Sequence, residues 1–391
     1  MPLAPVLAPA PIAETEPLAL YVHWPFCVSK CPYCDFNSHV RANVDQARWR
    51  EALLADLAHE AAQLPGRGLG SIFFGGGTPS LMPPATVAAV IDAATAHWAP
   101  ASTCEITLEA NPSSVEAARF ADLAAAGVNR VSLGLQALDD AALRFLGRAH
   151  DVPEGLAALD TAQRHFDRVS FDLITARPGQ SPDAWDAELA QALSFGTEHL
   201  SLYQLTIEPG TRFATLVAKG ELVLPDEDTA AELWSRTRAR AAAAGLPAYE
   251  VSNHARPGAE SRHNLTYWRY GDYAGIGPGA HGRRGGMATQ RHRKPENWLA
   301  AIDRHRHGLQ FEEPLAPRTR AVEALVMGLR LAEGIDLSRI GRQTGLAELL
   351  DAAAERRLAG LGLVERQGTR LRLTEAGAPL LDAILAELVL T

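Results

Sequence analysis

Short apolar segments alternate with longer amphipathic segments between residue 18 and about residue 245. The short segments are rich in β-branched and aromatic residues and predict six strands, at 20–24, 71–74, 104–109, 130–135, 169–174 and 200–206. The longer segments repeat apolar positions with the helical period and predict helices at 46–63, 85–97, 115–126, 141–149, 153–165, 182–194 and 229–244. This alternation is typical of α/β proteins that are built on a parallel sheet.

The number of these units bears on the architecture. Six strand and helix pairs are two fewer than a closed barrel of eight contains, so we predict an open, partial (β/α)6 barrel. The periodicity alone is equally compatible with a doubly wound sheet. Ligands bind at the carboxyl ends of the strands in both architectures, so polar residues at those ends are candidate site residues.

The pattern changes twice beyond the barrel segment, 18–245. Residues 246–313 are polar, aromatic and rich in glycine, and we expect a connecting segment there. Residues 314–391 predict helices at 323–332 and 347–359, a hairpin at 363–373 and a last helix at 376–388, which indicate a small α+β domain of winged-helix type. Residues 1–17 are rich in alanine and proline and are expected to form a disordered tail.

Composition narrows the classes of function. With 47% hydrophobic and 21% charged residues over 391 positions, the chain has the composition of a soluble globular protein. A net charge of -9 argues against nucleic acid as the main partner, because phosphate binding depends on lysine and arginine. No apolar run reaches the roughly 18 residues of a membrane-spanning helix, and the first residues lack a basic signal segment. We therefore expect a cytoplasmic protein.

Three of the four cysteines, Cys27, Cys31 and Cys34, lie within eight residues directly after the first predicted strand. A disulfide framework would spread its cysteines along the chain, so a metal site in a reducing compartment fits better. Three thiolates on one tight loop can hold three irons of a cubane [4Fe-4S] cluster and leave the fourth iron open to a substrate. For the spacing Cys-x3-Cys-x2-Cys, the expected substrate is S-adenosylmethionine (SAM).

Tetrahedral zinc is the alternative for this loop, with His23, Asp35 or His39 as the fourth ligand. The residue types alone leave the choice between zinc and a cluster open. The fourth cysteine, Cys104, lies in a strand-like run and is expected to be a small, buried apolar residue.

Glycines and polar residues follow the predicted strands. The second strand runs into the motif Gly76-Gly77-Thr78, which lacks the ending of a phosphate-binding P-loop and brings backbone within reach of a ligand or of a tight turn. Polar side chains lie at or near the ends of three successive strands: Glu109, Gln136 and Asp172. Such groups need a partner, which is either a neighbouring protein group or a shared ligand.

The cysteine segment, with Tyr33 before its last cysteine, resembles the radical SAM superfamily, and the longer string around it resembles the HemN and HemW branch. The resemblance extends from about residue 18 to the C-terminus. It implies that Cys27, Cys31 and Cys34 ligate the cluster. It also implies a set of residues around SAM and the cluster: Tyr21, Tyr33, Gly76, Gly77, Thr78, Glu109, Gln136, Arg148 and Asp172. Arg177 departs from the usual Tyr-Gly-Leu-Pro-Gly-Gln stretch and puts the substrate-side contacts in doubt.

Two features distinguish the members of this branch. The oxygen-independent coproporphyrinogen III oxidases carry a further cysteine two positions after the third ligand, where this chain has Phe36. The string from His263 to Trp268, HNxxYW, resembles a signature of the HemW haem chaperones. An imidazole among aromatic rings suits haem, so His263 is the candidate axial ligand, with His254 and His281 as alternatives. No Cys-x-x-Cys-His motif for covalent haem attachment is present.

The resemblance implies a haem chaperone that binds a [4Fe-4S] cluster, SAM and haem and delivers haem to acceptor proteins, respiratory ones among them. Homodimerisation, transient membrane contact and the cleavage of SAM are left open. The enzymatic alternative is oxidative decarboxylation of coproporphyrinogen III. A third alternative is DNA binding by the C-terminal domain through its arginines, which are Arg339, Arg342, Arg356, Arg357, Arg366, Arg370 and Arg372.

Overall fold

A computed structural model describes residues 16–41 and 43–389, so most of the tail predicted at 1–17 lies outside the described residues. The six predicted strands are present as β1 (Leu18–Trp24), β4 (Gly68–Gly76), β5 (Ala99–Ala110), β6 (Arg130–Gln136), β7 (Arg168–Thr175) and β8 (His199–Gln204). They pair in parallel in their order along the chain. The order never reverses, so the sheet has no switch point of the doubly wound type, and the partial-barrel prediction is confirmed.

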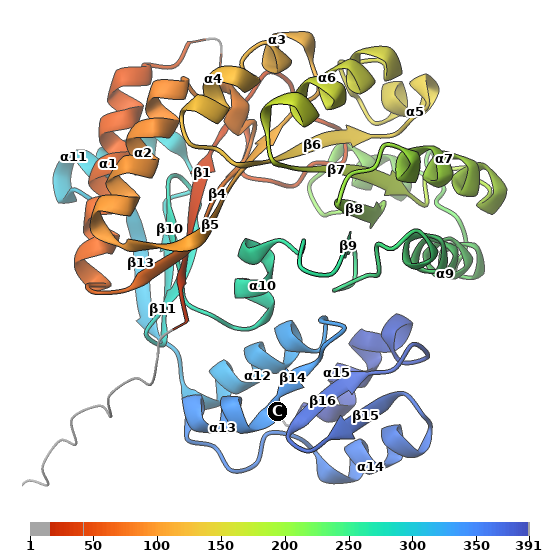
Figure 1. Ribbon diagram of the computed structural model, residues 1–391. Coiled ribbons are helices and arrows are strands. Elements are labelled where there is room, and N and C mark those ends of the chain that lie inside the picture. The colour runs from red at the N-terminus through yellow and green to blue at the C-terminus, as the bar shows by residue number, and fades with distance from the viewer. Residues whose placement is uncertain (1–15, 42, 390–391) are drawn as a thin grey trace, which may run out of the picture.

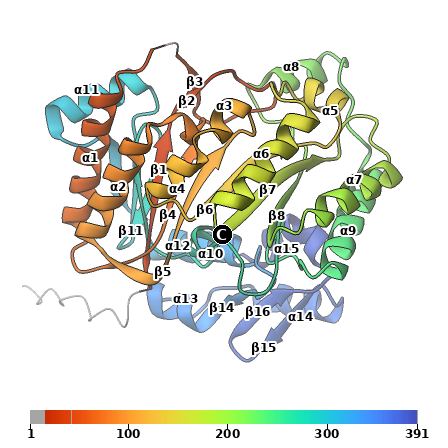
Figure 2. The same ribbon diagram turned by 45° about the horizontal axis from the view of Figure 1, so that its top comes forward.

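Helices cover the outer face of this curved sheet (Figure 1; Figure 2). They are α1 (Gln46–Gln63), α2 (Pro84–His97), α3 (Ser114–Ala117), α4 (Phe120–Ala125), α5 (Asp140–Phe145), α6 (Val152–His165), α7 (Pro182–Ser194) and α9 (Glu227–Ala243). The helix α8 (Arg212–Ala218) instead packs beside the cysteine loop, where the backbone of Phe213 donates to the carbonyl of Pro32. Aspartate or serine side chains cap many of them; Asp45, for example, accepts a hydrogen bond from the backbone of Arg48 at the start of α1. The main hydrophobic core lies between these helices and the sheet and includes Leu53, Phe74 and Trp185.

Residues 246–313, which we expected to connect two domains, instead widen the sheet on both edges to eleven strands. β9 (Asn253–Ala255) pairs antiparallel with β8, and β10 (Tyr273–Ile276) pairs in parallel with β1. β11 (His281–Arg284), β12 (Met287–Arg291) and β13 (Leu309–Pro314) follow antiparallel beyond β10. These strands are short and contain polar and small residues, so they carry little of the alternation by which strands are predicted.

A buried ion network fastens these added strands to α1. Arg291, Asp56 and Glu60 are fully shielded from solvent, and Arg291 donates to Asp56 at 2.9 Å and to Glu60 at 2.7 Å. Arg284 donates to the other oxygen of Glu60 at 2.7 Å. Because buried charges are tolerated only when they are paired, the network fixes β11 and β12 against the barrel. The helix α11 (Pro295–His305) packs on the same side of α1.

The C-terminal residues form a small α+β module with its own apolar core, which includes Leu325, Leu371 and Leu388. Its elements are α12 (Pro317–Gly328), β14 (Ile335–Asp336), α13 (Leu337–Thr344), α14 (Ala352–Gly360), β15 (Val364–Gln367), β16 (Arg370–Leu373), η2 (Ala378–Leu380) and α15 (Leu381–Leu388). Helices followed by a β hairpin agree with the predicted winged-helix type. We propose a domain boundary near residue 314, which the separate core supports.

The module lies against α10 (Arg262–Trp268), the helix that carries the HNxxYW motif (Figure 1). In the described part of the chain, no helix is both long enough and apolar enough to cross a membrane.

Candidate functional site

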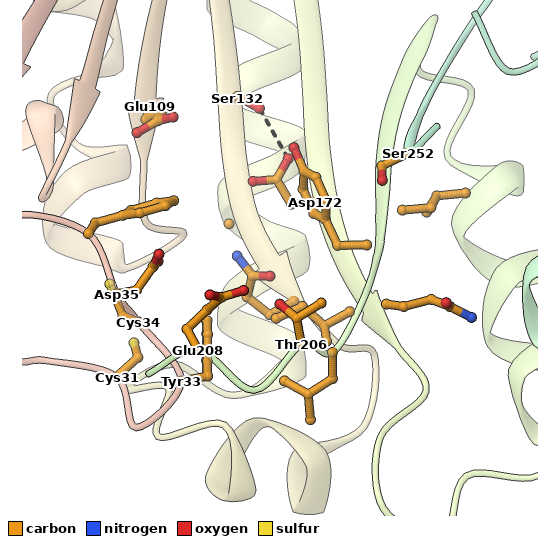
Figure 3. Close-up of a pocket in the computed structure, with 18 of the residues that line it drawn as sticks. Cys31, Tyr33, Cys34, Asp35, Glu109, Ser132, Asp172, Thr206, Glu208 and Ser252 are labelled. Carbon is orange, nitrogen blue, oxygen red and sulfur yellow. Dashed lines mark hydrogen bonds between the residues drawn. The ribbon is translucent and has the colours of Figure 1, made fainter. Parts of the chain in front are cut away.

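A cavity of about 1140 Å³ opens at the carboxyl ends of the barrel strands. The cysteine loop forms one wall, and residues of η2 and α15 from the C-terminal module line the far end. Figure 3 shows Cys31 and Cys34 on one side of this space and Glu109 and Asp172 on strands facing it. We call this space the main cavity. Its position agrees with the expectation for parallel α/β folds.

The cysteine loop follows β1 and is flanked by two short paired strands, β2 (Phe26–Cys27) and β3 (His39–Val40). The backbone N–H of Cys34 donates to the carbonyl of Cys31 at 3.2 Å, which forms a tight turn that brings these cysteines to one wall. Thr78 donates to the sulfur of Cys27 at 3.5 Å, and Arg148 donates to that of Cys31 at 3.4 Å. Burial raises the pKa of the Cys27 and Cys34 thiols, because the uncharged thiol is favoured away from water.

Among residues 16–41 and 43–389, no group of three or more His, Cys, Asp or Glu side chains is arranged to hold a single metal ion. This search does not test a cubane cluster, because a cubane takes each thiolate on a different iron. All three cysteines line the main cavity together.

The glycine motif brings bare backbone to the cysteine loop. A Cβ atom at Gly77 would lie 2.7 Å from the carbonyl oxygen of Phe26, and one at Gly76 would meet the ring of His23 at 2.6 Å. Gly76 also has a φ of +113°, which side chains other than hydrogen rarely allow. Glycine is therefore required at both positions for the loop to lie against the end of β4, and both residues and Thr78 line the cavity.

Two partly buried carboxyl groups, those of Glu109 and Asp172, line the main cavity. Glu109 accepts one hydrogen bond, from the backbone of Gly76 at 3.2 Å, and burial together with the nearby Asp172 raises its pKa to about 8. Asp172 accepts from Ser132 at 3.3 Å, and burial raises its pKa to about 6. A ligand with positive charge would offset the cost of ionising these groups in this place.

Arg148 and Gln136 complete the same wall. Arg148 donates to Asn111 at 2.6 Å and to the carbonyl of Gly134 at 2.9 Å, while its buried Nε has no partner among the described residues. Gln136 has a φ of 69°, an uncommon value for a residue with a side chain, which marks local strain at the end of β6. Gly134 leaves room for both, because a Cβ there would lie 2.8 Å from the Gln136 amide.

The structure does not bring every predicted residue to this cavity. Tyr33 lines it, but Tyr21 lines a second cavity and pairs its hydroxyl with His23 at 2.9 Å. Arg177 points away and forms an ion pair with Glu188 on α7, so it does not line the main cavity. Cys104 is partly buried and packs against the main core.

The second cavity, of about 370 Å³, lies between the cysteine loop and the added strands β10 and β11. Its lining includes Tyr267, Tyr273, His281 and Arg293, and it shares Phe36, Gly76 and Glu109 with the main cavity. The two cavities are therefore neighbours on either side of the end of β4.

The three candidate haem ligands lie in different environments. His263 is buried and lines neither cavity; its ring nitrogens bond to Ser71 at 3.1 Å and to Tyr267 at 2.9 Å. His254 is also buried outside both cavities, and neither ring nitrogen has a partner in the described residues. His281 is exposed and lines the second cavity. Haem could reach His263 only after one of its two hydrogen bonds opened.

Sequence reasoning missed many residues of the main cavity, among them Asn111, Gly134 and Tyr203. Asn111 receives the Arg148 hydrogen bond and donates to Thr78 at 3.1 Å, so it connects two predicted residues. It follows Glu109 in the segment after the third strand, so the rule that sites form at strand ends could have found it.

Comparisons with known proteins agree with this geometry. Residues 21–191 match the model of the Radical SAM superfamily, and residues 315–380 match that of the HemN C-terminal domain. This chain belongs to the radical SAM superfamily, and membership implies a [4Fe-4S] cluster and SAM.

Within that superfamily, the chain is 43% identical to "Radical S-adenosyl methionine domain-containing protein 1, mitochondrial" of Bos taurus, over 97% of this chain and 89% of that protein. It is 37% identical to "Heme chaperone HemW" of Mycobacterium tuberculosis, over 98% of this chain and 97% of that protein. The structure of coproporphyrinogen III oxidase (HemN) from Escherichia coli matches with a TM-score of 0.79 at 23% identity, over 96% of this chain and 90% of that one, which shows a common fold.

The residues of the main cavity fit both a [4Fe-4S] cluster and SAM. The three thiols line one space, which suits a cluster that takes each thiolate on a different iron. The two partly buried carboxyl groups suit a ligand that carries an ammonium and a sulfonium charge, and the Nε of Arg148 is a buried donor without a partner in the described part.

Proposed function

We propose that this protein is a haem chaperone that binds a [4Fe-4S] cluster, SAM and haem and passes haem to acceptor proteins, including respiratory ones. The observation that carries the proposal is the similarity to a protein named as a haem chaperone over nearly the whole of both chains. Phe36, at the position where the oxidases carry a cysteine, supports it. We propose a cytoplasmic location, where thiols stay reduced.

For the cofactors, we propose that Cys27, Cys31 and Cys34 ligate the cluster. When bound and reduced by an external electron donor, the cluster would be able to supply the single electron for reductive cleavage of SAM. The proposed surroundings of SAM are Tyr33, Gly76, Gly77, Thr78, Glu109, Gln136, Arg148 and Asp172, with Tyr21 behind them in the second cavity.

The chain's own groups have separate tasks in this proposal. The bare backbone at Gly76 and Gly77 lets the methionine part lie close to the loop. Ionised Glu109 and Asp172 would balance the positive charge of SAM, and Arg148 would hold its carboxylate. Burial of these groups strengthens each pairing, because little water competes for them.

A haem titration of anaerobically cluster-loaded protein, followed by visible absorption, tests the function, with an assay for coproporphyrinogen III decarboxylation in parallel. We expect one haem per chain and no decarboxylation. Decarboxylation without stable haem binding would instead indicate a coproporphyrinogen III oxidase. The chain shares the fold of such an oxidase.

DNA binding by the C-terminal module is less well supported. Arg357, Arg366 and Arg372 pair with Glu387, Glu355 and Glu365 on the module itself. Arginines already paired with carboxylates offer little net charge to phosphates. A mobility shift that disappears with added salt would be needed to support this alternative.

A further inference from the structure

An exposed histidine, an arginine and aromatic rings line the second cavity, which shares Tyr21, Gly76 and Glu109 with the proposed surroundings of SAM. Its volume of about 370 Å³ falls in the range of small-molecule sites, roughly 300 to 1,000 Å³. The buried network around Arg291 and Asp56 holds its outer wall in place. The cavity is therefore a built site and not a gap between loose loops.

His281 begins β11 at the rim of this cavity. Its ring makes one hydrogen bond in the described structure, between Nε2 and the side-chain amide of Gln290 at 3.2 Å. This partner is a flexible side chain near the surface, so it can move aside for a metal. Burial, together with the charges of Arg293 and Arg283, lowers the pKa of His281, which favours the neutral imidazole that binds iron.

The other walls suit a flat, apolar ring that carries negative groups. Tyr267 and Tyr273 pack edge to face with their ring centres 4.3 Å apart, and the exposed ring of Phe36 lies at the side of the cysteine loop. Arg293 is exposed at the rim and offers a guanidinium to a carboxylate. Aromatic faces, an available imidazole and a cation are the groups that haem and its propionates need.

We propose that the second cavity is the haem site, with the imidazole of His281 as the iron ligand and the guanidinium of Arg293 as the partner of a propionate. The inference rests on the proposed haem-chaperone function and deepens it. His263 and His254 lie outside both cavities, whereas His281 can reach iron without unfolding any element. The exposed rim leaves part of the haem accessible, as transfer to an acceptor requires.

The site is also attached to the cysteine loop. The side-chain amide of Asn37 donates to the carbonyls of Pro278 and Arg293, each at 2.9 Å, and a Cβ at Gly279 would collide with this amide. His23 bonds to the carbonyl of Asn37 at 2.9 Å from the barrel side. Phe36 and Asn37 thus build one wall of the haem site within three residues of Cys34.

The test is a haem titration of the full-length, cluster-loaded protein and of His281→Ala, His281→Met and Arg293→Ala, with His97→Ala as the matched control. His97 is an exposed histidine at the end of α2 and lies outside both cavities. We expect His281→Ala to weaken haem binding at least about tenfold and to change the visible spectrum, and added imidazole to restore that spectrum. His281→Met supplies a thioether, so it should shift the spectrum and not abolish it.

Arg293→Ala should weaken binding about three- to tenfold with the wild-type spectrum, because it removes a charge and no iron ligand. His97→Ala should match the wild type. Saturating SAM should leave haem bound, since SAM is assigned to the main cavity.

The outcomes separate this inference from the proposed function. A wild-type protein that binds no haem would overturn both. Normal haem binding with an unchanged spectrum in His281→Ala and His281→Met would overturn the location alone, as would stoichiometric displacement of haem by SAM, which would put haem in the main cavity.

Discussion

The two ends of the barrel interior contain the same kinds of side chain but pair them differently. Glu105 and Glu109 lie four residues apart on β5 and both point into the barrel. Glu105, at the amino end, accepts from Arg168 at 2.6 Å and from Ser261 and the backbone of His263 at 3.3 Å. Glu109, at the carboxyl end, accepts only from the backbone of Gly76. Glu105 therefore has a structural role, whereas Glu109 remains available to bind a ligand.

Arg168 on β7 and the helix α10 together account for the difference. The helix α10 closes the amino end of the barrel, where His263 bonds to Ser71 on β4 and Asn264 donates to Tyr249 at 3.4 Å. At the carboxyl end, the main cavity lies between the strands, the cysteine loop and residues of η2 and α15. Polar residues inside a barrel therefore predict a ligand only where no other part of the chain satisfies them.

The largest effect is expected at the carboxyl end of the barrel, where the cysteines line the main cavity. Cys31→Ala removes one of three thiols that no other protein group replaces, so we expect the cluster to be lost completely. Iron content and the visible absorption of anaerobically reconstituted protein measure this loss. The thermal midpoint of the cluster-free protein should change little, since Cys31 is at the surface of the cavity and outside the main core. A fully loaded variant would refute the ligand assignment.

The next effect tests the closed end. Glu105→Ala leaves Arg168 and the nearby Arg130 without their buried carboxylate, and removing one partner of a buried pair costs about 3–5 kcal/mol. Urea unfolding measures the loss. Glu198→Ala is the matched control, because this partly exposed carboxylate also pairs with Arg168 and should cost less than about 1 kcal/mol. Equal effects of the two variants would mean that burial does not distinguish these ion pairs.

Glu109→Gln, at the carboxyl end of the barrel, should change ligand affinity and not stability. It removes a charge that SAM would need but no protein partner, so we expect SAM affinity to fall about tenfold, or about 1.4 kcal/mol, without loss of stability. Equilibrium binding of labelled SAM and urea unfolding provide the two measurements. Unchanged SAM affinity would exclude Glu109 as a partner of SAM.

The raised pKa of Glu109 adds a pH dependence. With a pKa of about 8, this carboxyl is mostly protonated at pH 7, and a cationic ligand must displace its proton. SAM affinity should therefore rise with pH from about 6 to 8, by at most about tenfold per unit. In the ligand-free protein the folded state keeps a proton that the unfolded state releases, so the free energy of unfolding should fall as pH rises from 4.5 to 8. Glu109→Gln should flatten both profiles.

The sequence predicts the barrel well because its signals are long and regular. The helices at 46–63 and 182–194 have the observed bounds of α1 and α7, and all six barrel strands are found. The strands β10 to β13 have only four to six residues each and could not be recognised by alternation.

The candidate site shows the same limit. Residues at the carboxyl ends of strands, such as Glu109 and Asp172, meet in one cavity because the parallel sheet requires it. The places of Tyr21 and His263 depend on β10 and α10, which approach the barrel from far along the chain. Local sequence therefore indicates that these side chains need partners but not which partners they find.

The smallest effect on haem affinity is expected for His263. It decides whether this residue has a structural role or ligates haem. His263→Phe keeps an aromatic ring against Phe73, whose centre is 4.8 Å from the imidazole, but leaves Ser71 and Tyr267 without their hydrogen bonds. We expect a loss of about 1 to 2 kcal/mol in the free energy of unfolding, since each bond contributes about 0.5–1.5 kcal/mol. Haem affinity should stay within about twofold of the wild type, because a closed barrel end needs no ligand. A large loss of haem affinity at normal stability would make the closed end a binding site and would return the axial position to His263.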